Sequence, residues 1–387
     1  MKPHPILILV VYLLVNASTP IIDQGQFFFN EARYDSAINY FEKAEQLALK
    51  SSDWTSVIDS RLKLAETYRV INNTQKSLAY LDSAYAVLND HVAKPEKIGN
   101  QIVKSFGHDH FEQIAKALEI NGRVLDYNLR QFDNAKVYYD SSLEIRKRLY
   151  GNEHMTISEN IFLLGRIDFF KGQLEQASEK YLQAVDMKRK LGGDNEISLF
   201  DPYQSLGALN RRQLKMDESL KYYKKAEAIW EHNKRPADHP SYAMMVYGLG
   251  NLSIETGMYE DAKQNYRNAV TTFEKFFGPN DFRVATSYAN IAACYRNQLE
   301  FANAEQYYLK AHDIYTKALS EDHPFIVTSL SDLADMYHLF GYFDESSKYS
   351  ERAIQLMEKY QEKKGNRDLA ITKFVLRHKS CRSQKNI

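Results

Sequence analysis

One spacing pattern constrains this chain more than any other feature: a small residue returns at nearly the same interval along most of its length. A second small residue follows each one by seven positions, and in seven of eight units a bulky residue lies four positions after the first. Successive intervals are 40, 58, 42, 42, 43, 42 and 42 residues between the following positions: Ala37, Ser77, Ala135, Ala177, Ser219, Ala262, Ala304 and Ser346. This regularity predicts stacked structural repeats rather than one globular core.

Residues 247–269 show what a single unit predicts. Gly250 and Ala262 are small, whereas Tyr266 is large, and Gly257 lies between the two halves of the segment. Small residues let two helix backbones approach closely, and a neighbouring aromatic ring fills the remaining space. We therefore expect two antiparallel helices with a turn at Gly257.

The pattern resembles the tetratricopeptide repeat, a helix–turn–helix unit. The matching motifs are Leu164-Gly165, Leu206-Gly207 and Leu249-Gly250 in the first helices, and Tyr259-x-x-Ala262 and Phe301-x-x-Ala304 in the second helices. The longer period of 42 residues is similar to the kinesin-light-chain variety, with turns at Leu149-Tyr150-Gly151, Phe277-Gly278-Pro279 and Asp322-His323-Pro324. The resemblance implies an all-α fold, an α-solenoid (right-handed superhelix) of about eight such hairpins with a C-terminal capping helix. It also implies the binding of peptides or proteins.

The domain boundaries follow from where this register holds and where it breaks. We expect a signal peptide over residues 1–17, two repeats over 18–94, an inserted loop or helix extension over 95–112, six repeats over 113–360, and a capping helix with a basic tail over 361–387. The insertion accounts for the interval of 58 in place of 42, which is 16 extra residues. It contains His108-Asp109-His110, which we interpret as solvated loop residues because further ligands at helical spacing are missing.

The opening residues favour an exported protein. Lys2 precedes an apolar run over residues 6–15, and Val15-Asn16-Ala17 is typical of a cleavage site. The run is too short for a membrane-spanning helix, which needs about twenty residues. A real leader would place the protein in the periplasm or outside the cell. If the run is instead an opening helix packed on the first repeat, the protein is cytoplasmic.

Composition and motifs narrow the function further. Lys plus Arg equals Asp plus Glu, 50 against 50, whereas a nucleic-acid-binding protein would usually carry a basic excess. Two cysteines, Cys294 and Cys381, are too few for a disulfide framework. The chain contains no phosphate-binding loop, nucleophile elbow or zinc-protease helix motif. We therefore expect no catalytic residue, metal or cofactor, no nucleic-acid partner and no stable membrane span.

The remaining candidate is a peptide-binding groove. In a curved stack of hairpins the first helices line the concave side, and one face of each points into the groove. Arginine forks pair with carboxylates, and asparagine can hydrogen-bond an extended backbone. The predicted groove residues are Arg166, Phe169, Gln204, Arg211, Arg212, Tyr247, Asn251, Arg296 and Asn297.

These observations favour a non-catalytic scaffold that binds an extended, partly acidic segment of a protein partner. Two alternatives stay open at this point. The repeats could be the sensor or regulatory portion of a larger signalling or peptidase-type system whose effector domain lies elsewhere. They could also form a cytoplasmic adaptor of the kinesin-light-chain kind, although no heptad coiled coil precedes them.

Overall fold

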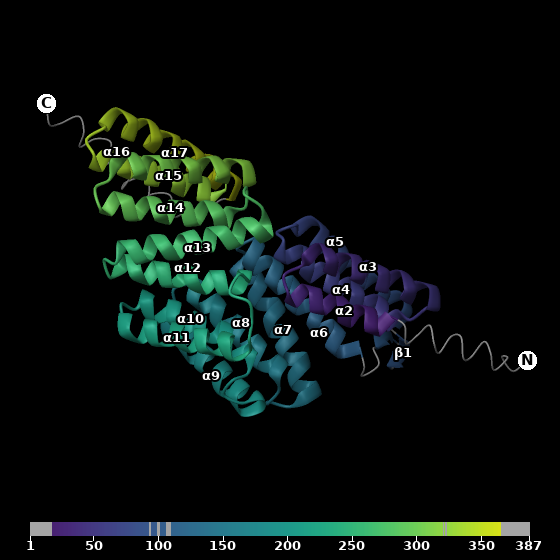
Figure 1. Ribbon diagram of the computed structural model, residues 1–387. Helices are drawn as coiled ribbons and strands as arrows, with labels where there is room; N and C mark the ends of the chain where they lie inside the picture. Colours follow the sequence, from purple (N-terminus) through teal and green to yellow (C-terminus); the bar gives the residue numbers. More distant parts are fainter. Residues whose placement is uncertain are drawn as a thin grey trace, which may run out of the picture. The chain divides into compact units, whose positions relative to one another are not determined.

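A computed structural model describes residues 18–92, 94–98, 101–105, 110–319, 321 and 323–364 (Figure 1). Within these ranges the chain forms sixteen α-helices, which pack in consecutive antiparallel pairs. It divides into two compact units, Met1–Arg235 and Pro236–Ile387. The predicted α-solenoid of eight helical hairpins is confirmed, with five hairpins in the first unit and three in the second.

The first unit contains ten of these helices. They are α2 (Ser18–Asn30), α3 (Tyr34–Ser51), α4 (Trp54–Val70), α5 (Thr74–Val87), α6 (Phe111–Arg123), α7 (Phe132–Tyr150), α8 (Met155–Phe170), α9 (Leu174–Gly192), α10 (Phe200–Arg212) and α11 (Met216–His232). The second unit contains α12 (Pro240–Glu255), α13 (Tyr259–Phe277), α14 (Phe282–Asn297), α15 (Phe301–Ala318), α16 (Pro324–Leu339) and α17 (Phe343–Lys364). No helix among the described residues is long and apolar enough to cross a membrane.

In five of the hairpins a glycine on the first helix lies in close contact with a bulky aromatic side chain on the second. A Cβ atom added at Gly250 would lie 2.7 Å from the ring of Tyr266, and one added at Gly25 would lie 2.5 Å from the ring of Phe41. Both rings are fully buried. The small residues of the repeat therefore set how closely the two helices of a hairpin approach.

Where serine replaces alanine at the crossing, it makes a hydrogen bond between the two helices. Ser77 Oγ donates to the carbonyl of Ala65 at 2.8 Å, and Ser346 Oγ donates to the carbonyl of Ala334 at 2.9 Å. Ser219 Oγ donates to the carbonyl of Gly207 at 2.9 Å. A buried hydroxyl without a partner would cost stability, so this bond makes serine acceptable at a buried position.

Histidine begins three of the helices by capping them. The Nδ1 atoms of His154, His239 and His323 accept hydrogen bonds from the backbone N–H groups of Thr156, Ser241 and Phe325 at 3.3, 3.1 and 3.2 Å. Pro240 and Pro324 then occupy the first helical position, where a missing N–H costs nothing. The two His-Pro pairs thus serve to begin helices.

The insertion differs from the predicted loop or helix extension. Residues Lys94–Ile98 (β1) and Gln101–Ser105 (β2) form a two-stranded antiparallel sheet in which Lys94 pairs with Ser105 and Ile98 with Gln101. Ile98, Ile102 and Val103 are β-branched residues, which favour an extended strand over a helix. His108 and Asp109 lie outside the described residues.

The third hairpin carries one extra residue, which a π-helical turn absorbs. Gly122 lies thirteen positions before Ala135, whereas the corresponding small residues elsewhere, such as Gly250 and Ala262, are twelve apart. The turn spans Val124–Asn128, directly after α6. π-Helical bulges accommodate such single insertions and are frequent near functional sites.

Both ends of the chain lie outside the described ranges. The predicted signal peptide at residues 1–17 therefore stays a prediction, as does the capping helix and tail beyond residue 364. The final helix, α17, continues to Lys364, four residues beyond the predicted end of the repeats.

We expect Ala262→Leu to lower the free energy of unfolding by roughly 1–3 kcal/mol, because overfilling a packed crossing forces backbone and side-chain shifts. Ala262 has no exposed surface. Thermal and urea unfolding followed by circular dichroism would measure the change. Ala302→Leu on exposed surface of α15 is the control. Equal stability of the two variants would contradict the role of the crossing.

A second expectation concerns the turn between the two helices of each hairpin. In all eight turns, the residue five positions before the first small residue of the second helix has a positive φ. Gly257 (φ 78°) and Leu299 (φ 63°) occupy this position in neighbouring hairpins, and Leu299 is 68% exposed. A left-handed conformation costs a non-glycine residue about 1–2 kcal/mol. We expect Leu299→Gly to raise, and Gly257→Ala to lower, the midpoint of urea unfolding. Shifts in the same direction would contradict this account.

Candidate functional site

A cavity of about 590 Å³ in the first unit is lined mainly by the first helices of four consecutive hairpins. Side chains at spacings of three and four residues share one face of a helix, which is how α4 and α6 each present several groups to it. Its polar lining residues are Gln26, Asp59, Lys63, Glu66, Glu112, Gln113, Lys116, Glu119, Arg123, Arg146, Thr156, Glu159, Lys188 and Ser198. Its apolar lining residues are Phe29, Leu62 and Met155.

A buried arginine forms the base of the charge network beside this cavity. Arg146 on α7 is 1% exposed, and its Nη1 lies 2.6 Å from Glu119 Oε2, a carboxylate that is 2% exposed. Its Nη2 lies 2.8 Å from Glu112 Oε1, and Nη1 also donates to Asn160 Oδ1 at 2.7 Å. A guanidinium can be buried only when its donors are satisfied in this way.

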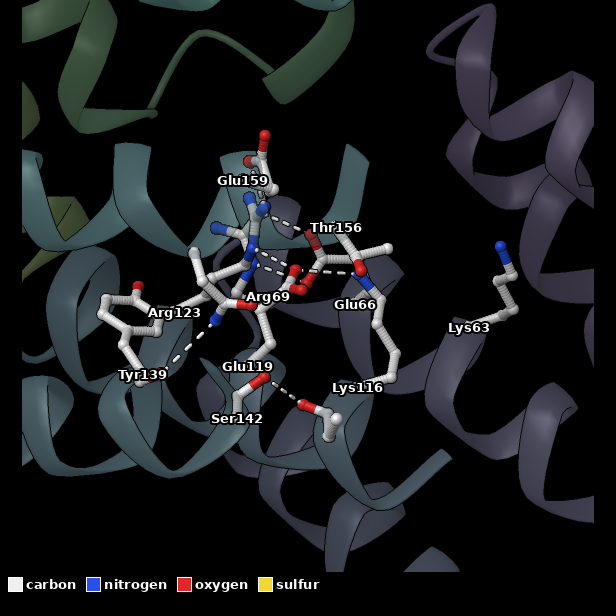
Figure 2. A network of polar contacts seen from close by, with 12 residues as sticks. Lys63, Glu66, Arg69, Lys116, Glu119, Arg123, Tyr139, Ser142, Thr156 and Glu159 are labelled. Atoms are coloured by element: carbon white, nitrogen blue, oxygen red, sulfur yellow. Dashed lines mark hydrogen bonds and ion pairs between the residues drawn. The ribbon is translucent and has the colours of Figure 1, made fainter. Parts of the chain in front are cut away.

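The network extends to the next hairpin through shared carboxylates. Arg123 Nε lies 3.0 Å from Glu119 Oε1, and Arg123 Nη2 lies 2.7 Å from Glu159 Oε1 (Figure 2). Lys188 Nζ on α9 lies 2.8 Å from the other oxygen of Glu159. Burial alone would raise the pKa of Glu119, but Lys116, Arg123 and the buried arginine hold that pKa well below its usual value. These carboxylates are therefore ionised and paired at neutral pH.

One cation lining the cavity differs from the others. Lys63 on α4 forms no ion pair with a carboxylate among the described residues, and its ammonium group donates instead to Gln26 Oε1. Figure 2 shows its amine apart from the linked groups around Glu119. Burial lowers the pKa of Lys63, and the positive charge of Lys116 lowers it further. An anionic group placed here would relieve both unfavourable effects.

A carboxyl group one helical turn away completes this part of the cavity. Asp59 Oδ1 accepts a hydrogen bond from Gln113 Nε2 at 2.8 Å, which joins α4 to α6. Burial is the largest cause that raises the pKa of Asp59, against the opposing effects of Gln113 and Lys63. Asp59, Glu66 and Asp23 act on Lys63 from a distance and raise its pKa, but none of them forms an ion pair with it among the described residues.

The sequence-predicted groove residues of the first unit lie on α8 and α10, outside this cavity lining. Arg166 is already engaged: its Nε lies 2.8 Å from Asp126 Oδ2, and its guanidinium lies 3.6 Å from the centre of the Tyr127 ring. Arg212 Nη1 donates to the carbonyl of Phe169 at 3.0 Å and lies over the ring of the same residue. Gln204 and Arg211 are half-buried on α10.

The predicted residues of the second unit fall into two pairs. Tyr247 and Asn251 on α12 are brought together by Asn290, whose Nδ2 donates to Tyr247 Oη at 2.8 Å and to Asn251 Oδ1 at 3.2 Å. Arg296 and Asn297 lie at the end of α14, half-buried and exposed respectively. Within each unit several of the predicted residues are thus engaged with neighbouring side chains, and the role of all nine in binding stays a prediction.

Sequence reasoning missed the cavity although a signal for it existed. Lys63 and Glu66 on α4, and Lys116 and Glu119 on α6, are charged pairs at i,i+3 on helices expected to carry apolar packing faces. The buried partner Arg146 gave no separate signal, because arginine on a second helix is ordinarily solvent-exposed.

Comparison with known proteins identifies the repeats. The family model for the tetratricopeptide repeat matches residues 113–190 and 283–359. The chain is 22% identical to Protein KINESIN LIGHT CHAIN-RELATED 2 of Arabidopsis thaliana over 88% of this chain and 59% of that protein. It is 25% identical to the Clustered mitochondria protein homolog of Homo sapiens over 48% of this chain and 14% of that protein. It thus spans less than two thirds of the length of these relatives.

Solved structures share the fold at low sequence identity. The APC/C hetero-tetramer Cut9-Hcn1 is similar with a TM-score of 0.59 and 12% identity, covering 93% of this chain and 55% of that chain. Rap protein complexed with Competence and Sporulation Factor is similar with a TM-score of 0.58 and 13% identity, covering 83% and 87%. At these identities the likeness concerns the fold alone.

We expect Glu119→Gln to lower the free energy of unfolding by about 3–5 kcal/mol, because it leaves the buried guanidinium of Arg146 without its closest counter-charge. Urea unfolding at pH 7 measures the loss. The control is Asp140→Asn, which breaks the exposed pair with Lys136 and should change stability by at most about 1 kcal/mol. Similar losses in the two variants would contradict the assigned importance of the buried network.

Proposed function

The chain is a tetratricopeptide repeat protein with kinesin-light-chain-like repeats, and on that premise we propose that its first unit binds an extended, acidic segment of a partner protein. The cavity bordered by α2, α4, α6 and α8 receives this segment. The role is that of a non-catalytic scaffold. The observation that carries the proposal is Lys63, a half-buried cation facing the cavity without a carboxylate partner among the described residues.

The size and lining of the cavity support a segment rather than a whole protein face. A volume of about 590 Å³ accommodates a few side chains and lies within the range of ligand pockets, roughly 300–1,000 Å³. Phe29, Leu62 and Met155 offer apolar contact to the side chains of such a segment. The solved Rap protein complexed with Competence and Sporulation Factor is a precedent for a factor bound by this fold.

We infer that the segment is acidic because one cation of the cavity lining has no carboxylate partner among the described residues, whereas the others are already ion-paired. Arg123, Arg146 and Lys188 have their own carboxylates at 2.6–3.0 Å, so an incoming anion would gain little from them. Lys63 lacks one, whereas Lys116, 39% exposed in the same cavity, already lies 2.8 Å from Glu119 Oε1. A carboxylate beside the ammonium group of Lys63 would form a charge-assisted hydrogen bond in a site partly shielded from water.

The experiment is a selection of random peptides displayed on phage against the full-length chain. We expect selected peptides to be enriched in Asp and Glu. Lys63→Glu should weaken their binding at least about tenfold in titrations of fluorescent synthetic copies, which corresponds to about 1.4 kcal/mol. The matched control is Lys136→Glu on the exposed face of α7. Peptides without acidic enrichment, or equal affinity of both variants, would overturn the proposal.

We further propose that the protein acts outside the cytoplasm, on the basis of the leader-like residues 1–17. Expression of the full-length chain followed by N-terminal sequencing tests this directly. A mature protein that starts near Ser18 is the expected result. An unprocessed chain would contradict export.

A further inference from the structure

Two of the residues that follow α11, Asn233 and Arg235, make contacts beside the cavity. Asn233 Nδ2 donates to the carbonyl of Asn195 at 2.9 Å. Arg235 Nη2 donates to the carbonyl of Asn30, and Arg235 Nη1 lies 3.4 Å from Glu31 Oε1. The end of the fifth hairpin is thereby tied to the turn of the first hairpin, 204 residues earlier in the chain.

The residues so joined are neighbours of the cavity wall. Phe29 lines the cavity and directly precedes Asn30, whereas Ser198 lines it three residues after Asn195. Residues 233–235 therefore connect a wall formed by α2 with a wall formed by the segment before α10. A tie between two walls limits how far they can separate.

The tie is anchored firmly at one end and weakly at the other. The backbone N–H of Arg235 donates to the carbonyl of Trp230 at 3.2 Å, and the Trp230 ring lies 4.6 Å from the ring of Phe200. At the other end, the side chains of Arg235 and Glu31 are 24% and 34% exposed. A partly exposed ion pair contributes little to stability, so this end can open without unfolding the repeats.

We infer that residues 233–235 act as a clasp that controls access to the cavity. The inference rests on the proposed function only in that the cavity is taken as the binding site. With the clasp closed, small molecules reach the cavity and bulky groups are hindered. Release of Glu31 and Asn30 by Arg235 lets the turn of the first hairpin move away from residues 233–235 and admits a larger segment. Because a bound segment favours the open state, occupancy and clasp opening are linked.

Thiol labelling tests the clasp without any partner. The full-length chain carries Met155→Cys as the reporter in the cavity lining, with Cys294→Ala and Cys381→Ser to remove the native thiols. The rate of modification is measured with iodoacetamide as a small reagent and with a maleimide carrying a polyethylene glycol chain as a bulky one. For each reagent, the rate at the reporter thiol is divided by the rate with free cysteine. In the protein with an intact clasp, this ratio should be far lower for the bulky reagent than for iodoacetamide.

Arg235→Ala should raise the rate of modification by the bulky maleimide about fivefold, the factor expected for loss of one weak interaction. It should leave the rate with iodoacetamide nearly unchanged. Glu31→Gln keeps the contact with Asn30 and should give a smaller increase. It also serves as the test variant if Arg235→Ala does not fold by circular dichroism. Lys234→Asn is the matched control, because the Lys234 side chain is exposed and asparagine tolerates its positive φ.

Equal rates of bulky modification in the parent chain, Arg235→Ala and Glu31→Gln would overturn the clasp. An equal acceleration by Lys234→Asn would overturn it as well. Because no peptide is present, these outcomes leave the proposed binding of an acidic segment standing. Conversely, failure of the peptide selection would leave the labelling rates, and the clasp they report, unaffected.

Discussion

The contact between a small residue on one helix and a bulky side chain on the next determines the rest of this structure. At Gly122 a single added carbon would lie 2.5 Å from the ring of Tyr139, a distance that packed atoms do not tolerate. The helices of each hairpin are therefore fixed at short range, and the first helices present matching faces along each unit. Only because those faces line up can side chains from four hairpins border one cavity.

The cavity combines two kinds of electrostatic environment. On one side, buried carboxylates such as Glu119 are shared between several cations, which makes this wall rigid and chemically saturated. On the other side, Lys63 and Asp59 are held by the amides Gln26 and Gln113. Amides satisfy hydrogen bonds without neutralising charge, so this wall retains the capacity to bind an ion. The two walls therefore differ in whether their charged groups are already ion-paired.

The sequence was sufficient for the fold because the fold depends on local, periodic signals. The interval between Ala262 and Ala304 defines a repeat, and the capping and proline at His323-Pro324 mark where a first helix begins. The β-hairpin in the insertion could not be predicted in the same way, since a segment that interrupts the period has no neighbour to be compared with. The extra residue between Gly122 and Ala135 was visible in the spacing but pointed to no particular conformation.

The candidate site was less predictable for a physical reason. The sequence analysis inferred from helix geometry alone which side chains face a groove. It placed Arg166 among them. In the structure the same side chain is held by Asp126 and Tyr127, both from the π-helical turn of the preceding hairpin. Pairing between hairpins depends on three-dimensional partners, and a periodic pattern does not report which charges are already satisfied.

The ion network also bears on how such a protein can evolve. A solenoid usually gains or loses members by duplication or deletion of one unit, because each repeat meets only generic neighbours. Here Arg123 of the third hairpin depends on Glu159 of the fourth, and Arg146 of the third depends on Asn160 of the fourth. Deleting either hairpin would strand charges inside the other. We therefore expect these two hairpins to be kept or lost together when repeats are duplicated or deleted.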